Sequence, residues 1–306
     1  MSETHFYPVG RPGEPWGPSE IEEWRQRQIR QRSYADDILA RVTALGGRFK
    51  LLRYGEIDYA GEAYTLVALR SARVDPLLPS ALVSGGVHGY ETSGVLGALA
   101  LLDAHGEDYA GRLNLLVAPC VSPWAYERIN RWNYDAVDPN RNFRAGGPSG
   151  EANALIDLVR GAASPYLVHI DLHETTDTDA SEFSPARAAR DGKTFEAETI
   201  PDGFYLVDDS DNPQPEFQQA IIATVEEVTH IAPADASGEI IGSPLVARGV
   251  IEYPLRELGL CPSITGAKYT TTTEVYPDSP GATPAACVEA QVAAVRAALD
   301  YALSNR

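Results

Sequence analysis

The alternation of buried strands and helices constrains the fold of this chain most strongly. A short apolar run at 81–84 ends in Gly85 and Gly86, and the small apolar residues at 92–102 then predict a helix packed against a sheet. Further strands are predicted at 113–118, 166–172, 203–207, 250–253 and 270–275, and further helices at 217–229 and 284–303. This order predicts an α/β fold: a single-domain, mixed, mostly parallel twisted sheet with helices on both faces. Sheets of this kind bind ligands beyond the carboxyl ends of their strands.

The remaining segments are assigned from their prolines, glycines and apolar patterns. Four prolines and three glycines in the first 18 residues predict an irregular arm at 1–18 without chemistry of its own. Helices at 19–29 and 33–45 and a hairpin with strands at 49–54 and 64–69 follow. No linker or repeat divides residues 19–306, which we assign to one domain. Its acidic stretch at about 175–202 predicts a long loop that borders the functional site.

Charge and composition exclude several classes of partner. The chain has 25 Lys and Arg against 43 Asp and Glu, a formal charge of −18, which repels nucleic acid and anionic lipid. No apolar run approaches the roughly 20 residues of a membrane span, so we expect no membrane partner. The three cysteines lie far apart and predict buried thiols in the cytoplasm. No sequence feature indicates the oligomeric state.

His88 and Glu91 stand three residues apart between a predicted strand end and a predicted helix start. Gly85 and Gly86 allow the chain to turn sharply before them. A neutral imidazole and a carboxylate are suitable zinc ligands. The alternative is a polar turn in which the two side chains only hydrogen-bond locally, and the pair alone favours that alternative.

A second group of polar residues ends the strand predicted at 166–172. His173 lies at the carboxyl end of this strand, where it would complete a set of two histidines and one glutamate with an open fourth position on zinc. His169 is the rival ligand, but it lies deeper in the strand and is expected to be a hydrogen-bonded core residue. Asp171 shares a strand face with both histidines, and either supports a ligand or makes a plain hydrogen bond.

The third segment, 130–143, is dense in amides and guanidinium groups. The planar guanidinium of Arg141 can donate two hydrogen bonds to a carboxylate, and the amide of Asn140 could donate another. The alternative is a loop whose own Asp, Asn and Arg side chains satisfy one another.

Taken together, the three segments resemble the zinc carboxypeptidase superfamily, whose relatives include murein-peptide amidases and the aspartoacylase and succinylglutamate desuccinylase branch. The resemblance is carried by Gly86-Val87-His88-Gly89-Tyr90-Glu91, Asp138-Pro139-Asn140-Arg141-Asn142-Phe143 and Asp171-Leu172-His173, and it extends from about residue 54 to 276. It implies that residues 19–306 form a zinc carboxypeptidase-like catalytic domain.

The resemblance also implies a role for each site residue. His88, Glu91 and His173 would bind one Zn²⁺ ion, and Asn140 and Arg141 would hold the carboxylate of the substrate. Arg128 would polarise the scissile carbonyl, with Arg131 in reserve. Glu274, in a strand that resembles a late strand of the family, would be the general base in preference to Glu252. Tyr253 would close over the substrate.

This resemblance predicts a zinc-dependent metallopeptidase of the carboxypeptidase type, which hydrolyses an amide bond adjacent to a free carboxylate. The closest alternative is a deacylase of N-acyl amino acids, because Asp171-Leu172-His173-Glu174-Thr175-Thr176 is close to the aspartoacylase pattern. A member of the fold that binds metal or peptide without catalysis is the other alternative. The predicted substrate is therefore a peptide or an N-acyl amino acid with a free carboxylate.

Overall fold

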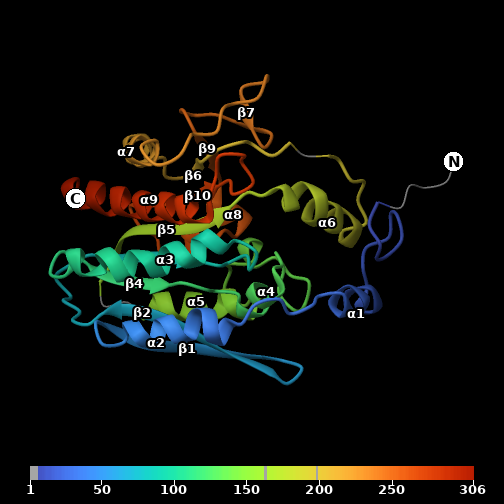
Figure 1. Ribbon diagram of the computed structural model, residues 1–306, viewed down its shortest axis with the longest axis horizontal. Coiled ribbons are helices and arrows are strands. Elements are labelled where there is room, and N and C mark those ends of the chain that lie inside the picture. Colours follow the sequence, from blue (N-terminus) through green and yellow to red (C-terminus); the bar gives the residue numbers. More distant parts are fainter. Residues whose placement is uncertain (1–5, 162–163, 198) are drawn as a thin grey trace.

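An eight-stranded sheet organises the molecule in the computed structural model, which describes residues 6–161, 164–197 and 199–306. The strand order is β1-β2-β4-β3-β5-β10-β6-β9 (Figure 1). The strands are β1 (Phe49–Tyr59), β2 (Glu62–Ser71), β3 (Ser80–Gly85), β4 (Asn114–Ala118), β5 (Tyr166–Glu174), β6 (Tyr205–Asp209), β9 (Val250–Tyr253) and β10 (Tyr269–Val275). A two-stranded hairpin of β7 (Glu239–Ile240) and β8 (Ser243–Pro244) lies outside this sheet.

The sheet is mixed, and its centre is parallel. Strands β4, β3, β5 and β10 run in one direction, and β6 pairs with β9 in parallel. The hairpin β1–β2 joins β4 antiparallel, and β6 joins β10 antiparallel. Strands β3, β4, β5 and β10 therefore end at one edge of the sheet, where side chains from distant parts of the sequence can meet.

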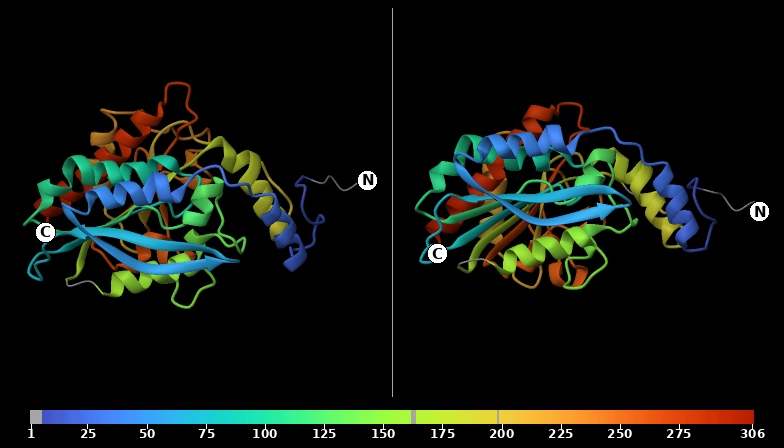
Figure 2. Two further views of the ribbon diagram at one scale, coloured as in Figure 1. Left: turned by 60° about the horizontal axis from the view of Figure 1, so that its bottom comes forward. Right: turned by 90° about the horizontal axis from the view of Figure 1, so that it is seen from below.

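Helices cover both faces of the sheet (Figure 2). On one face lie α2 (Ala40–Leu45), α3 (Thr92–His105), α7 (Pro215–Val225) and α9 (Pro284–Ser304), and on the other lies α5 (Gly150–Arg160). Side chains alternate along the buried strands: Val83 joins the core beneath α3 and α9, whereas Leu82 joins the core with Leu155 of α5. The predicted fold class is confirmed.

Several elements differ from the predictions. The strands β1 and β2 continue to a tight turn at Ala60 and Gly61, so the hairpin is longer than expected. The short helix α4 (Pro123–Arg128) and the helix α5 were not predicted. The stretch expected to be a loop at 175–202 contains a π-helical turn, Asp179–Phe183, followed by α6 (Ser184–Arg190).

The described part of the amino-terminal arm is irregular but packed. Tyr7 and Trp16 are buried, and the Tyr7 hydroxyl donates a hydrogen bond to Glu182. The backbone amide of Trp16 donates to the carbonyl of Arg190 at the end of α6. The arm thus lies against the segment 179–190, next to α1 (Pro18–Gln26) (Figure 1).

Candidate functional site

The segment between β3 and α3 carries His88 and Glu91 into the interior. Gly86 has a φ of +60°, which a glycine adopts without strain, and the chain turns sharply there. A side chain at Gly89 would collide with the backbone of Ala125. Gly86 therefore permits the turn, and Gly89 allows this segment to pack closely against α4. Glu91 is the N-cap of α3.

His173 reaches the same place from the carboxyl end of β5. Its Nδ1 lies 2.8 Å from Oε2 of Glu91, and the Nδ1 of His88 lies 2.7 Å from Oε1 of Glu91. One ligand atom from each of the three residues lies within 4.8 Å of the other two. The structure thus brings the three predicted ligands together in a buried cluster that could hold one metal ion.

Carboxylates hold the far side of each imidazole. The Nε2 of His88 lies 3.0 Å from Asp138, and the Nε2 of His173 lies 2.6 Å from Asp171. Such carboxylate partners fix the orientation of metal-binding histidines and leave the other ring nitrogen to the metal. Asp171 therefore makes the contact with a potential ligand, His173, that was one of its two predicted roles. Asp138 makes the equivalent contact with His88, which was not predicted.

The contacts around Glu91 fit a metal ion. Its Oε2 is buried without a hydrogen-bond partner, because the contact with His173 lacks hydrogen-bond geometry. Burial opposes the ionisation of Glu91, but His173 and His88 outweigh it and lower its pKa to about 2. An ionised carboxylate facing two imidazole nitrogens is a suitable donor set for zinc, and a cation would satisfy the unpaired oxygen.

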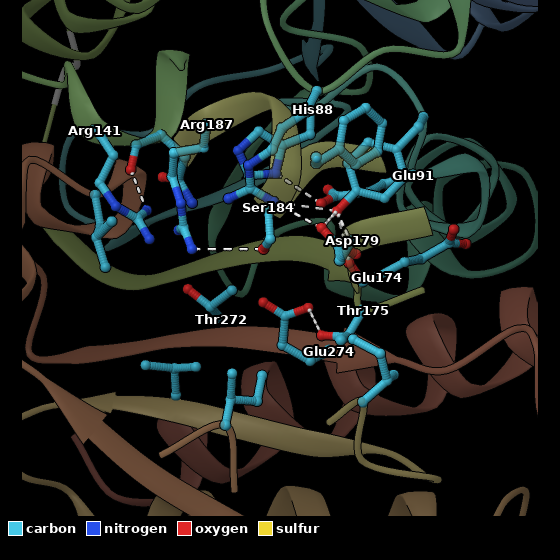
Figure 3. Close-up of a pocket in the computed structure, with 18 of the residues that line it drawn as sticks. His88, Glu91, Arg141, Glu174, Thr175, Asp179, Ser184, Arg187, Thr272 and Glu274 are labelled. Atoms are coloured by element: carbon cyan, nitrogen blue, oxygen red, sulfur yellow. Dashed lines mark hydrogen bonds and ion pairs between the residues drawn. The ribbon is translucent and has the colours of Figure 1, made fainter. Parts of the chain in front are cut away.

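A cavity of about 260 Å³ opens beside the cluster, and Glu274 of β10 faces it. Figure 3 shows Glu274 and Thr175 on one side and the pair His88 and Glu91 across from them. The hydroxyl of Thr175 donates to Oε2 of Glu274 over 2.9 Å. Burial raises the pKa of Glu274 to about 7, which places this carboxyl in the range where an acid or base exchanges protons at neutral pH.

Arg128 does not line this cavity. Its guanidinium donates two hydrogen bonds to Glu62, at 2.8 and 2.9 Å, and lies over the ring of Trp124. Ile129 follows with a φ of +51°, a left-handed residue that ends α4 and redirects the chain. The structure thus places the predicted catalytic arginine in an ion pair away from the cluster.

Arg131, the reserve candidate, does line the cavity. Its Nε donates to Asp138 over 3.1 Å, and its Nη1 donates to Asp179 over 3.1 Å. It is mostly buried, with 17% of its side chain exposed. A fixed guanidinium near the three potential metal ligands can stabilise negative charge on a carbonyl oxygen.

Asn140, Arg141 and Tyr253, the predicted substrate-binding residues, also line the cavity. The amide of Asn140 lies 3.3 Å from Nε2 of His173. One nitrogen of Arg141 donates to the carbonyl of Asn140, and burial lowers the pKa of the guanidinium. Figure 3 shows Arg141 beside Arg187, so positive charge gathers on one side of the cavity.

The segment 179–190 supplies residues that the sequence did not reveal. Asp179 accepts hydrogen bonds from Tyr90 and Arg131, and Arg187 lines the cavity on the side of Arg141. Polar residues in a short helix give no sequence signal for the face they present. The expectation that this stretch borders the site agrees with its position along the cavity.

The competing residues have other environments. His169 is buried, and its Nε2 lies 3.1 Å from the hydroxyl of Ser84. Burial lowers the pKa of His169 to about 4, as for a neutral core histidine. Glu252 does not line the cavity beside the cluster of His88, Glu91 and His173. The three cysteines of the chain are free and buried.

Solved structures with a similar fold include proteins described as metallopeptidases and carboxypeptidases. A protein of Shewanella denitrificans described as a candidate metallopeptidase has a TM-score of 0.65 at 20% identity, covering 90% of this chain and 96% of its own. A metallo-carboxypeptidase of Burkholderia cenocepacia has a TM-score of 0.59 at 15% identity, with coverages of 87% and 69%. Bovine thrombin-activatable fibrinolysis inhibitor has a TM-score of 0.60 at 13% identity, with coverages of 90% and 99%.

These structures define the fold class: the chain has the metallocarboxypeptidase fold. No protein-family model matches the sequence, and no curated protein does either. Among the described residues, no helix combines the length and the apolar character needed to cross a membrane.

The contact between Asp171 and His173 gives a first prediction. Replacing Asp171 with Asn should weaken Zn²⁺ binding about 10- to 100-fold, because an amide orients the imidazole less strongly than a carboxylate does. Competition with a chromogenic chelator measures this affinity. The matched control is Asp208→Asn, a buried carboxylate that accepts hydrogen bonds from Asp209, Gln214 and Gln218. Equal affinities of the two variants would contradict the supporting role of Asp171.

Proposed function

We propose that this chain is a zinc-dependent carboxypeptidase-type hydrolase, which cleaves a peptide at an amide bond adjacent to a free carboxylate. The observation that carries the proposal is the cluster of three potential metal ligands beside a cavity that Glu274 and Arg131 also line. His88, Glu91 and His173 would hold the ion. When bound, zinc acts as a Lewis acid and makes hydroxide available near neutral pH.

Glu274 is the proposed general base. It would accept a proton from water and later deliver that proton to the amine that leaves. The pKa of about 7 suits both transfers, because the group then binds and releases protons at neutral pH. Thr175 would hold the carboxyl group in position through its hydrogen bond.

Arg131 is the proposed donor to the carbonyl oxygen of the scissile bond. It replaces Arg128 in this role because Arg128 is engaged by Glu62 and lies outside the cavity. Asn140 and Arg141 would bind the carboxylate of the substrate, and Arg187 adds positive charge beside them. These contacts would determine which amide bond of the substrate reaches the metal ion.

A comparison of two substrate classes tests the proposal. The metal-loaded protein should release the terminal residue from peptides with a free carboxyl terminus, and amidation of that terminus should abolish the release. Cleavage of N-acyl amino acids alone would show that the chain is a deacylase. Bound metal without turnover of either class would identify a non-catalytic member of the fold.

A further inference from the structure

The β7–β8 hairpin carries an isoleucine in an unfavourable backbone conformation. Ile240 pairs with Ser243, and the two residues between them, Ile241 and Gly242, have φ angles of +49° and +68°. Two-residue hairpin loops with positive φ at both positions favour Asn-Gly, because asparagine and glycine tolerate the left-handed region. A β-branched side chain there is an outlier, since its branched carbon crowds the backbone.

Ile241 lines the cavity beside the three potential metal ligands. Val207 of β6 and Leu260 line the same cavity, and Ile241 packs against the hydrophobic cluster to which both belong. Thr272 of β10, two residues before Glu274, also lines it. The loop therefore keeps a costly conformation at the position where a branched apolar side chain faces the space for a substrate.

Both ends of the hairpin are anchored. Ile240 is almost fully buried, and the hydroxyl of Ser243 donates to the hydroxyl of Tyr253 over 3.3 Å. Tyr253 lines the cavity as well. These contacts hold Ile241 at a fixed place relative to the predicted substrate-binding residues.

We propose that Ile241 is a specificity-determining residue that forms an apolar wall for the side chain of the substrate's terminal residue. The wall of Ile241, Val207 and Leu260 favours branched aliphatic side chains such as that of leucine. This inference rests on the proposed function, because it places the terminal residue beside Arg141. The strained loop is retained for the contact with substrate at the expense of stability.

The chain contains a matched control for backbone strain. The hairpin of β1 and β2 has the same kind of two-residue loop, with Ala60 and Gly61 at φ angles of +53° and +90°. Ala60 is exposed and does not line the cavity. Replacing either Ile241 or Ala60 with Asn should relieve strain in the left-handed region, but only the first change removes a cavity wall.

The test measures stability and selectivity together. Ile241→Asn and Ala60→Asn should each raise the Tm by about 2 °C, which corresponds to the release of left-handed strain in a protein of this size. For the zinc-loaded protein, Ile241→Asn should lower kcat/KM about tenfold for a peptide that ends in leucine, and much less for one that ends in alanine. Ala60→Asn should leave both values unchanged, and Ile241→Val should keep the preference for leucine.

Each contrary outcome has a separate meaning. A lower Tm for Ile241→Asn would show that the packing of Ile241 outweighs its backbone strain, which would overturn the claim that the loop is kept at the expense of stability. An unchanged ratio of leucine to alanine cleavage would exclude a role in specificity. If the wild-type protein cleaves no peptide, the proposed function fails. Calorimetric binding of free leucine and alanine then decides the inference: equal weakening of both ligands, or no weakening, in Ile241→Asn would overturn it.

Discussion

Replacing Glu274 with Gln should lower kcat by at least about 10²-fold while leaving zinc affinity within a few-fold of the wild-type value. Glutamine keeps the shape of the side chain but cannot accept a proton, and general base catalysis contributes about 10² to 10⁴. The metal ligands His88, Glu91 and His173 are not altered, so the ion should still bind. Stopped-flow hydrolysis and a chelator titration measure the two quantities, and an unchanged kcat would remove Glu274 from the mechanism.

Stability at different pH values provides a folding control for the same variant. In the metal-free protein the pKa of Glu274 is about 7, above its ordinary value of 4.5, so the unfolded chain ionises first as pH rises. The group therefore lowers the free energy of unfolding as pH increases from about 4.5 to 7, by up to about 3 kcal/mol. Glu274→Gln lacks this loss. Its free energy of unfolding in urea should therefore rise relative to that of the wild type as the pH increases from 5 to 8. A constant difference between the two proteins would contradict the raised pKa.

Replacing Arg131 with Gln should lower kcat about 10²- to 10³-fold, the cost of removing one donor to a developing oxyanion. Arg128→Gln is the matched control, since it removes the same guanidinium three residues earlier, outside the cavity. We expect Arg128→Gln to retain kcat within a few-fold and to lose only stability, because Arg128 pairs with Glu62.

Zinc affinity separates two roles of Arg131. The guanidinium also contacts Asp138, the carboxylate that holds His88. If Arg131 stabilises the oxyanion, kcat falls in Arg131→Gln and zinc affinity stays nearly constant. A parallel fall in zinc affinity would show that it acts through Asp138 instead. Loss of activity in Arg128→Gln but not in Arg131→Gln would restore the assignment made from the sequence.

The strand ends could be predicted because their sequence signals are local. Buried strands followed by glycines or polar residues identify the carboxyl edge of a parallel sheet, and this edge is where His88, His173 and Glu274 lie. The register of β5 against β10 places Glu274 opposite His173. Because parallel strands end at the same edge of a sheet, the strand pattern was enough to predict which residues meet at the site.

The loop residues could not be predicted in the same way. Arg128 and Arg131 have similar surroundings in the sequence, and the choice between them depends on the left-handed Ile129 at the end of α4. A non-glycine residue gives no signal for this conformation. For the same reason the strain at Ile241 is visible only in the folded chain.

The helix α5 was missed because its signals compete. It begins at Gly150, a residue that more often marks a turn, and runs for only three turns. Ser149 caps it by accepting a hydrogen bond from the amide of Ala152. A cap and a short apolar stripe, rather than helix propensity, define this element.

The packed amino-terminal arm affects how this protein should be prepared for biochemistry. Tyr7 and Trp16 hold the segment 179–190, which contributes Asp179 and Arg187 to the cavity. A chain trimmed to begin at Ser19 would keep every predicted catalytic residue, yet one wall of the cavity would lose its outer support. Kinetic work on a shortened chain would therefore describe an altered cavity.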